Sequence, residues 1–192
     1  MYKLCKSEQS AARQRTLELG LLDMMQSVPF EQISITDFCD RMNIPRKAFY
    51  RYFSDKESAL YALIDHTLME YENFPPITKK GKRTILTDLE QFLLFWKEQK
   101  MLLDALQRSN LMPLLASRTM EYAVHFGGIS ARFLADAQDE LLPYQMEFAL
   151  TGMLSMVIKW HSGGFREPAA QLAAILARLL TKPLFTTGDP LF

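Results

Sequence analysis

Residues 34–57 read SITDFCDRMNIPRKAFYRYFSDKE and contain two helix-start signals with a break between them. Ser34–Asp37 and Ser54–Glu57 each have the spacing of a capping box, in which a serine hydroxyl accepts an early amide of the helix. Asn43–Pro45 interrupts the pattern, because asparagine tolerates a left-handed helix cap, and proline disfavours a helical residue before it and suits the opening of a new helix. The stretch therefore predicts two short helices joined by a turn at 43–44, the first over 35–42 and the second over 45–52.

The same stretch is basic within a chain that is neutral overall. The 192 residues contain 22 Lys and Arg against 22 Asp and Glu. Residues 41–56 contain five basic residues and one acidic residue, a local charge of +4. A short helix fits the DNA major groove, where Arg and Lys reach guanine edges or phosphates. With Phe38, Met42, Ile44 and Phe49 expected in the core between the helices, the second one has the arrangement of a recognition helix. A solvated basic face is the alternative that charge alone leaves open.

Helical patterns continue on both sides of this stretch. A first helix is predicted over about 8–28, ended by Pro29, and another runs from Asp55 towards Pro75 and Pro76. Gly and Pro residues then separate further helical patterns near 86–107, 114–126, 129–141, 144–162 and 168–181. We expect an all-α protein of about nine helices. Its expected domains are 1–73, a linker over 74–84, and a larger helical domain over 85–192.

Residues 36–57, with Leu60 after them, resemble the helix-turn-helix signature of TetR/AcrR-type transcription regulators. The core Tyr50-x-Tyr52-Phe53-x-x-Lys56-Glu57 is the most specific part of the resemblance, which covers residues 10–65. The resemblance implies a homodimer that reads a palindromic operator in double-stranded DNA. The sequence departs from the usual pattern at Met42-Asn43, at Pro45, at Pro29 and at Cys39. Pro45 removes an amide that could have met a phosphate.

The resemblance also implies DNA contacts, position by position. Two residues match the start of the first motif helix, which touches the DNA backbone: Ser34 and Thr36. Three match base-facing positions: Arg46, Lys47 and Ala48. Three match phosphate-facing or groove-facing positions: Tyr50, Arg51 and Tyr52. Lys56 matches a phosphate anchor at the N-terminus of the next helix, where the helix dipole favours an anion.

The last two predicted helices are the candidates for a dimer interface. Helix 144–162 is apolar around almost its whole circumference and must be covered, whereas helix 168–181 has one apolar stripe. Together they could form half of an intermolecular four-helix bundle, as the resemblance also implies. The candidate interface residues are Met153, Met156, Val157, Trp160, Leu172, Ile175, Leu176 and Leu179. Residues 152–180, with Trp160, Gly164 and Pro168, are similar to the tail of a TetR branch that includes regulators of dihydroxyacetone kinase genes.

Aromatic and Met side chains gather in the predicted helices between 86 and 141. Such side chains suit a pliable apolar cavity, so a small-molecule effector is expected there. The candidate pocket residues are Phe92, Phe95, Trp96, Met112, Tyr122, His125 and Phe126. Ordinary core packing is the alternative, because the same residue types at helical spacing also fill protein interiors.

Other functional classes lack support in the sequence. No H-E-x-x-H, G-x-S-x-G or P-loop motif is present, and the three His residues form no acid, base and nucleophile set, so neither an enzyme nor a cofactor is expected. Cys5 and Cys39 form no C-x-x-C pair, which predicts no metal site and a reduced, cytoplasmic protein. Cys39 is interpreted as a small buried residue rather than a redox sensor. The longest uncharged stretch, 148–158, is shorter than the ~20 residues that cross a bilayer.

These observations predict a dimeric DNA-binding transcription regulator that acts as a repressor and is released by a small-molecule effector. The alternative is a helical regulator or adaptor that is controlled by a protein partner and has no small-molecule ligand of its own.

Overall fold

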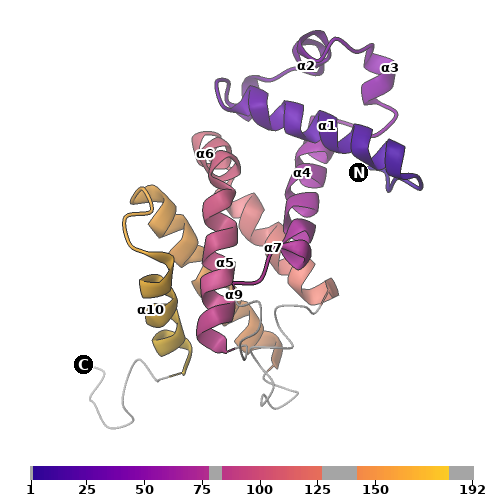
Figure 1. Cartoon of the computed structure of the whole chain (residues 1–192). Coiled ribbons are helices and arrows are strands. Elements are labelled where there is room, and N and C mark those ends of the chain that lie inside the picture. The colour runs from indigo at the N-terminus through magenta and orange to yellow at the C-terminus, as the bar shows by residue number, and fades with distance from the viewer. Residues whose placement is uncertain (1, 78–83, 127–141, 182–192) are drawn as a thin grey trace. The chain divides into compact units, whose positions relative to one another are not determined.

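The computed structural model describes residues 2–77, 84–126 and 142–181, and within these ranges it contains α-helices and no β-sheet (Figure 1). The described helices are α1 (Glu8–Met25), α2 (Ile35–Arg41), α3 (Arg46–Phe49), α4 (Lys56–Glu70), α5 (Ile85–Glu98), α6 (Lys100–Arg108), α7 (Met112–Phe126), α9 (Leu142–Ser162) and α10 (Ala169–Thr181), with 3-10 turns η1 (Phe30–Gln32) and η2 (Tyr71–Asn73). The all-α prediction is confirmed. The helix predicted over 129–141 lies outside the described residues. No described helix is long and apolar enough to span a membrane.

The chain folds into two compact units that alternate along the sequence. The first unit combines Met1–Asn73 with Lys100–Phe126, and the second combines Phe74–Gln99 with the chain from Gly127 onwards. In the first unit α1 packs on α4 and α6, and α4 packs on α7. In the second unit α5 packs on α9 and α10. The predicted domain boundary at 74–84 stays a prediction, because each compact unit is defined by packing and combines segments that are far apart along the chain.

The prediction of one helix over 86–107 is wrong, because the chain breaks at Gln99 into α5 and α6. Gln99 leaves the helical region with ψ at 23°, and its N–H lies 3.2 Å from both the Phe95 and Trp96 carbonyl oxygens. No glycine or proline marks the break. It coincides with the passage from one compact unit to the other, so the apolar stripes of α5 and α6 are buried in different cores.

The turn between α2 and α3 forms as the local sequence predicts. The Ser34 hydroxyl caps α2 by accepting the Asp37 amide at 3.1 Å. Asn43 adopts the expected left-handed conformation with φ at 50°, and the Ile44 amide then donates to the Cys39 carbonyl at 2.9 Å. Helix α3 is shorter than the predicted 45–52. The backbone tightens after it, with the amide of residue 52 donating to the carbonyl of residue 49 at 3.0 Å.

Helix α4 begins one residue later than the predicted Ser54–Glu57 box. Asp55 is the N-cap, and its carboxylate accepts the Ser58 amide at 2.7 Å and the Ser54 hydroxyl at 2.8 Å. The Ser58 hydroxyl accepts the Asp55 amide in return, at 3.3 Å. An ionised carboxylate accepts stronger hydrogen bonds than a hydroxyl, so Asp55 displaces Ser54 as the cap. The bonds from Ser58 and Ser54 hold the pKa of Asp55 below its ordinary value.

Replacing Asp55 by alanine should lower the free energy of unfolding by about 1 kcal/mol at neutral pH, the usual effect of losing an N-cap. Because the folded-state pKa is the lower one, the cap stabilises the fold above the unfolded-state pKa and loses its effect as the pH falls through the folded-state pKa. Urea denaturation of parent and variant at neutral pH and at a series of acidic pH values measures this. The difference between the two proteins should shrink towards low pH, and a constant difference would contradict the assignment.

Candidate nucleic-acid interface

An aromatic cluster holds α2 and α3 together. The rings of Phe38 and Phe49 meet edge to face with centroids 5.6 Å apart, and Phe49 lies 5.3 Å from Phe53. All three side chains are at most 2% exposed. Cys39 is buried beside them, as predicted, and burial raises the pKa of its thiol. The inner face of the motif is therefore a closed core, which fixes the outer face of α3.

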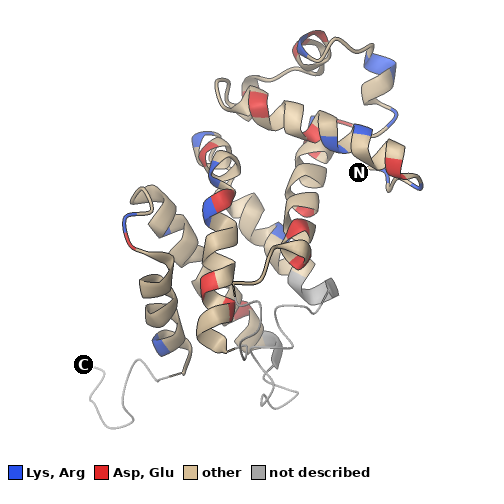
Figure 2. Cartoon of the chain, viewed as in Figure 1, with Lys and Arg blue, Asp and Glu red and all other residues tan. Residues whose placement is uncertain are grey.

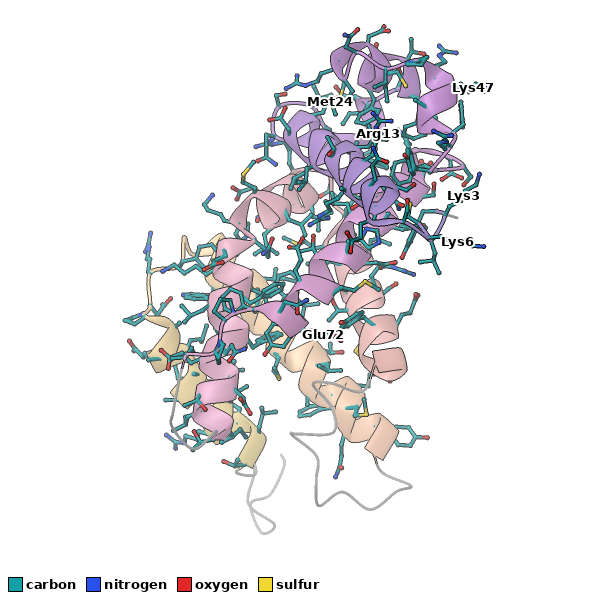
Figure 3. The ribbon with its side chains drawn as sticks, turned by 45° about the vertical axis from the view of Figure 1, so that its right-hand side comes forward. Lys3, Lys6, Arg13, Met24, Lys47 and Glu72 are labelled. Atoms are coloured by element: carbon teal, nitrogen blue, oxygen red, sulfur yellow. The ribbon has the colours of Figure 1, made fainter. Side chains whose placement is uncertain are left out.

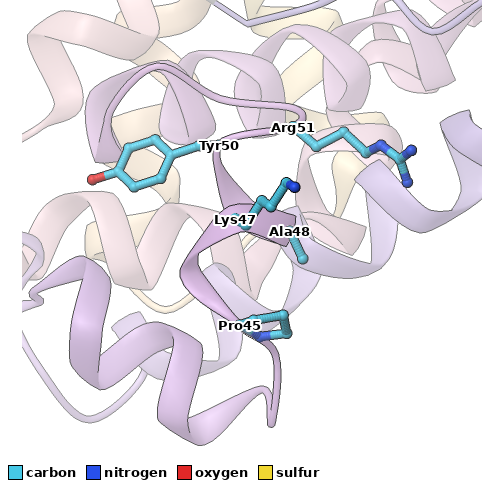
Figure 4. Close-up of a pocket in the computed structure, with 5 residues that line it drawn as sticks. All are labelled: Pro45, Lys47, Ala48, Tyr50 and Arg51. Carbon is cyan, nitrogen blue, oxygen red and sulfur yellow. The ribbon is translucent and has the colours of Figure 1, made fainter.

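The outer face of α3 and the turn after it is basic and exposed. Lys47, Ala48, Tyr50 and Arg51 line an open hollow of about 530 Å³ together with Pro45 (Figure 4). Tyr50 is 49% exposed, although the Phe49 ring that it contacts edge to face is buried. Figure 2 shows basic residues on α3 and on the segment that follows it. Four of the predicted DNA-contacting residues thus share one accessible surface.

Two further predicted residues meet at the start of the motif helices. The Arg46 guanidinium donates a hydrogen bond to the Thr36 hydroxyl, so the first turn of α2 and the first turn of α3 lie together. Arg46 is exposed and Thr36 is half-buried. Ser34 is exposed next to them, with its hydroxyl also donating to the Asp37 carboxylate at 2.5 Å. These residues extend the basic surface from α3 to the N-terminus of α2.

Tyr52 and Lys56 lie elsewhere than the resemblance implies. Tyr52 is only 4% exposed, with its ring in the core beside Phe53. The tight turn after α3 directs residues 52 and 53 inward together. A groove-facing role for Tyr52 therefore does not fit this fold.

The ammonium of Lys56 is engaged by the protein itself. It donates to the carbonyl oxygens of Phe30, Glu31 and Ile33 at 3.0, 3.0 and 3.1 Å, and it lies 4.8 Å from the centre of the Phe30 ring. An ammonium has three N–H donors, so none remains for a phosphate in this arrangement. Lys56 instead ties the start of α4 to η1. Three carbonyls that converge on one point leave no pattern in a sequence, so sequence reasoning could not find this role.

The candidate pocket residues are divided between the two units. Phe92, Phe95 and Trp96 are buried in the second unit, with Trp96 in edge contact with both phenylalanines at 5.5 to 6.3 Å. Met112 and Tyr122 belong to the first unit, where the Tyr122 hydroxyl donates to Glu72 at 2.9 Å. Burial and this bond raise the pKa of Tyr122. The side chains of the remaining two candidates, His125 and Phe126, are outside the described part of the chain.

Most of the candidate interface residues serve the protein's own core. Five of the eight are buried within the second unit, namely Met153, Val157, Trp160, Leu172 and Leu176, and Met156 is half-buried. The Trp160 indole donates to the Glu167 carbonyl at 3.0 Å, which holds the turn before α10. Of the eight, Ile175 and Leu179 are exposed, and on α9 two residues outside the candidate set, Tyr144 and Phe148, are 74% and 69% exposed. When a helix has apolar residues around its whole circumference, the sequence pattern does not show which side is buried and which is exposed.

Within the described ranges, no group of His, Cys, Asp and Glu side chains is arranged to hold a metal ion.

Comparison with known proteins places the fold. No family model and no curated protein matches the sequence. Solved structures that are similar over most of their length include three transcription regulators. The dihydroxyacetone kinase operon activator DhaS matches with a TM-score of 0.58 and 16% identity, over 87% of this chain and 93% of that one. A tetR-family transcriptional regulator from Streptomyces coelicolor matches with a TM-score of 0.58 and 18% identity, over 88% and 79%.

The fatty acid degradation regulator FadR from Bacillus halodurans matches with a TM-score of 0.56 and 13% identity, over 94% of this chain and 98% of that one. At these identities the likeness concerns the fold and not the ligand or the target DNA. The chain has the all-α fold of these helical transcription regulators.

Proposed function

We propose that this protein is a sequence-specific, dimeric, DNA-binding transcription regulator that works in the cytoplasm. One observation carries the proposal: the aromatic core of the helix-turn-helix presents the basic and aromatic surface of α3 to solvent. A chain with no net charge has no general affinity for polyanions, so a concentrated basic surface indicates a defined nucleic-acid contact. The shared fold with three transcription regulators supports the same conclusion.

In this proposal α3 enters the major groove. Arg46 and Lys47 reach base edges at the start of the helix, where both side chains are exposed. Tyr50 and Arg51 reach the flanking phosphates from the turn that follows. The N-terminus of α2, with Ser34 and Thr36, approaches the DNA backbone, where its free amides favour an anion. Ala48 lies within the hollow, next to the reading residues.

The proposed dimer uses the exposed apolar side chains of α9 and α10. Among the described side chains of these two helices, the exposed large apolar ones are Tyr144 and Phe148 on α9, and Ile175 and Leu179 on α10. Covering them with a second copy removes apolar area from water. A two-fold dimer places two α3 helices about 34 Å apart, in successive major grooves, and so reads a palindrome.

We further propose that the regulator represses by occupying its operator and is released by a small-molecule effector. An effector that binds more tightly to a dimer with a different spacing of its α3 helices lowers the affinity for the operator. Within the second unit the candidate pocket residues are Phe92, Phe95 and Trp96. One protein of this fold is an operon activator, so the test includes a reporter gene behind the selected operator, which measures whether the protein represses or activates transcription.

The test is selection of bound sequences from a random DNA pool by the purified protein at two salt concentrations, with the mass measured by light scattering. We expect enrichment of a palindrome by a particle of about twice 22.2 kDa. A monomer that enriches no sequence and binds no DNA would refute the proposal. That result would favour the alternative function, a helical adaptor controlled by a protein partner.

Arg46→Ala and Lys47→Ala should each cost about 1–3 kcal/mol of discrimination between the selected duplex and a scrambled one. The loss follows because each side chain is expected to contact base edges that differ between the two duplexes. Fluorescence anisotropy with both duplexes measures the ratio of dissociation constants. Lys100→Ala is the control, because Lys100 is an exposed basic residue paired with Asp104 at the start of α6. Unchanged ratios in both α3 variants would refute the assigned recognition helix.

A further inference from the structure

The first residues of the chain lie against the turn that follows the recognition helix. We call Tyr2–Lys6 the N-terminal arm. Tyr2 forms an isolated antiparallel bridge with Phe53, and the Lys3 amide donates to the Tyr52 carbonyl at 3.0 Å. Tyr52 directly follows Arg51, which lines the hollow on α3. The arm is therefore attached to the edge of the proposed DNA-binding surface.

Side-chain contacts fix the arm at both ends. The Tyr2 hydroxyl donates to the Asp65 carboxylate of α4 at 2.7 Å, and the Tyr2 ring packs edge to face on His66 with centroids 5.6 Å apart. Burial and the bond to Asp65 raise the pKa of Tyr2. At the other end the Cys5 thiol donates to the Gln14 side-chain oxygen of α1 at 2.8 Å. Terminal segments are usually mobile unless such contacts hold them. These contacts therefore hold the N-terminal arm in place.

The anchored residues face inward and the basic residues face outward. Tyr2 and Cys5 are half-buried, whereas Lys3 and Lys6 are exposed. Leu4, between them, is 79% exposed. In Figure 3 the two lysines project on the same side of the first unit as Lys47 of α3. The arm contains no acidic residue that would neutralise them.

We propose that Lys3 and Lys6 bind phosphates of the DNA backbone beside the base pairs that α3 reads. The inference rests on the proposed DNA-binding function and adds a second, sequence-independent contact to it. The arm is already ordered, so contact with DNA costs little further backbone entropy. Its lysines extend the positive surface of α3 along the backbone. Contacts of this kind set affinity and position, and they leave the reading of bases to α3.

The test is the double variant Lys3→Gln/Lys6→Gln. Glutamine keeps the length of each side chain and removes its charge, and the Lys3 amide still donates to Tyr52. Anisotropy titrations with the selected and the scrambled duplex, over a series of salt concentrations, give affinity and salt slope. Loss of two phosphate contacts should reduce the slope by about 1.8 and weaken binding about 30-fold at 0.15 M salt. Both duplexes should be affected equally, so discrimination should not change.

Two control variants separate the role of the arm from a general effect of charge. Lys100→Gln removes a positive charge from α6, beside the C-terminal end of α1, where Gln26 donates to the Met101 carbonyl at 3.0 Å. It should bind like the parent. Lys3→Arg/Lys6→Arg keeps both charges and should keep the parent salt slope. Circular dichroism should show that all variants are folded, because none of the substituted side chains is buried.

The possible results distinguish the two hypotheses. If Lys3→Gln/Lys6→Gln binds like Lys100→Gln while the α3 variants lose discrimination, the arm inference is wrong and the proposed function stands. If the arm variant loses discrimination between the duplexes, the lysines contact bases and the phosphate assignment is wrong. If neither the arm variant nor the α3 variants differ from the parent, the proposed recognition surface itself is wrong.

Discussion

Phe49→Ala is expected to lower the free energy of unfolding by about 3–5 kcal/mol, the usual loss when a buried phenylalanine is truncated. Phe49 is 2% exposed and lies at the centre of the aromatic cluster, between Phe38 of α2 and Phe53. Helices as short as α2 and α3 have little stability of their own, so their arrangement depends on this packing. A cavity at residue 49 therefore removes both stability and the outward presentation of α3.

Tyr50→Ala is the matched control for this prediction. It truncates the neighbouring aromatic residue, which is half-exposed and contacts Phe49 edge to face at 5.5 Å. Its loss of stability should be no more than about 1 kcal/mol, while DNA binding should weaken because the hydroxyl that we propose to face a phosphate is gone. Urea denaturation followed by circular dichroism measures the stability of both variants. Equal losses in the two variants would show that the aromatic cluster does not support the motif.

The second large effect is expected at Asp65. Its carboxylate accepts hydrogen bonds from the Arg118 Nε at 2.8 Å and from the Tyr2 hydroxyl at 2.7 Å, and it also accepts one from Arg118 Nη2. This partly buried pair joins α4 to α7, which are distant in sequence. Asp65→Ala leaves a half-buried guanidinium without its main partner, and breaking a fully buried pair of this kind costs about 3–5 kcal/mol. Arg118 keeps Glu121 as a partner, which places the expected loss near 3 kcal/mol.

An exposed ion pair provides the comparison for Asp65. Asp23 and Arg41 also form an ion pair, at 2.6 Å, but both side chains are about half-exposed or more, so Asp23→Ala should cost no more than ~1 kcal/mol. Adding Arg118→Met to Asp65→Ala should recover part of the loss, because it removes the unpaired charge. Urea denaturation of the three variants measures these differences. No recovery in the double variant would mean that the cost arises from lost packing and not from the unpaired guanidinium.

Local signals in the sequence predicted the elements near the helix-turn-helix correctly. The Ser34 cap, the left-handed Asn43 and the inward Phe38 and Phe49 all depend on bonds or packing within about ten residues. Such features are encoded by residue type and spacing, because the interacting groups are close along the chain. The all-α class followed from the same periodicity.

Features that depend on distant partners do not follow from local patterns in the sequence. The break at Gln99 separates two apolar stripes that belong to different compact units. Lys56 was expected at a phosphate, but the carbonyls of residues 30, 31 and 33 accept its three N–H donors. Most candidate interface residues on α9 and α10 are buried within the second unit, where α5 packs on both helices. In each case the contact that decides the outcome is made by residues far along the chain. The helical periodicity of a segment carries no information about such residues.

The sequence by itself determined the helical class, the turn between α2 and α3, and the basic character of residues 41–56, because caps, prolines and charge are local properties. The tertiary structure decided which basic side chains remain exposed and which are used internally. It brought Lys3 beside Tyr52 and turned Tyr52 inward. These outcomes depend on which surfaces are buried against each other, and burial is a property of the packed chain rather than of any short segment.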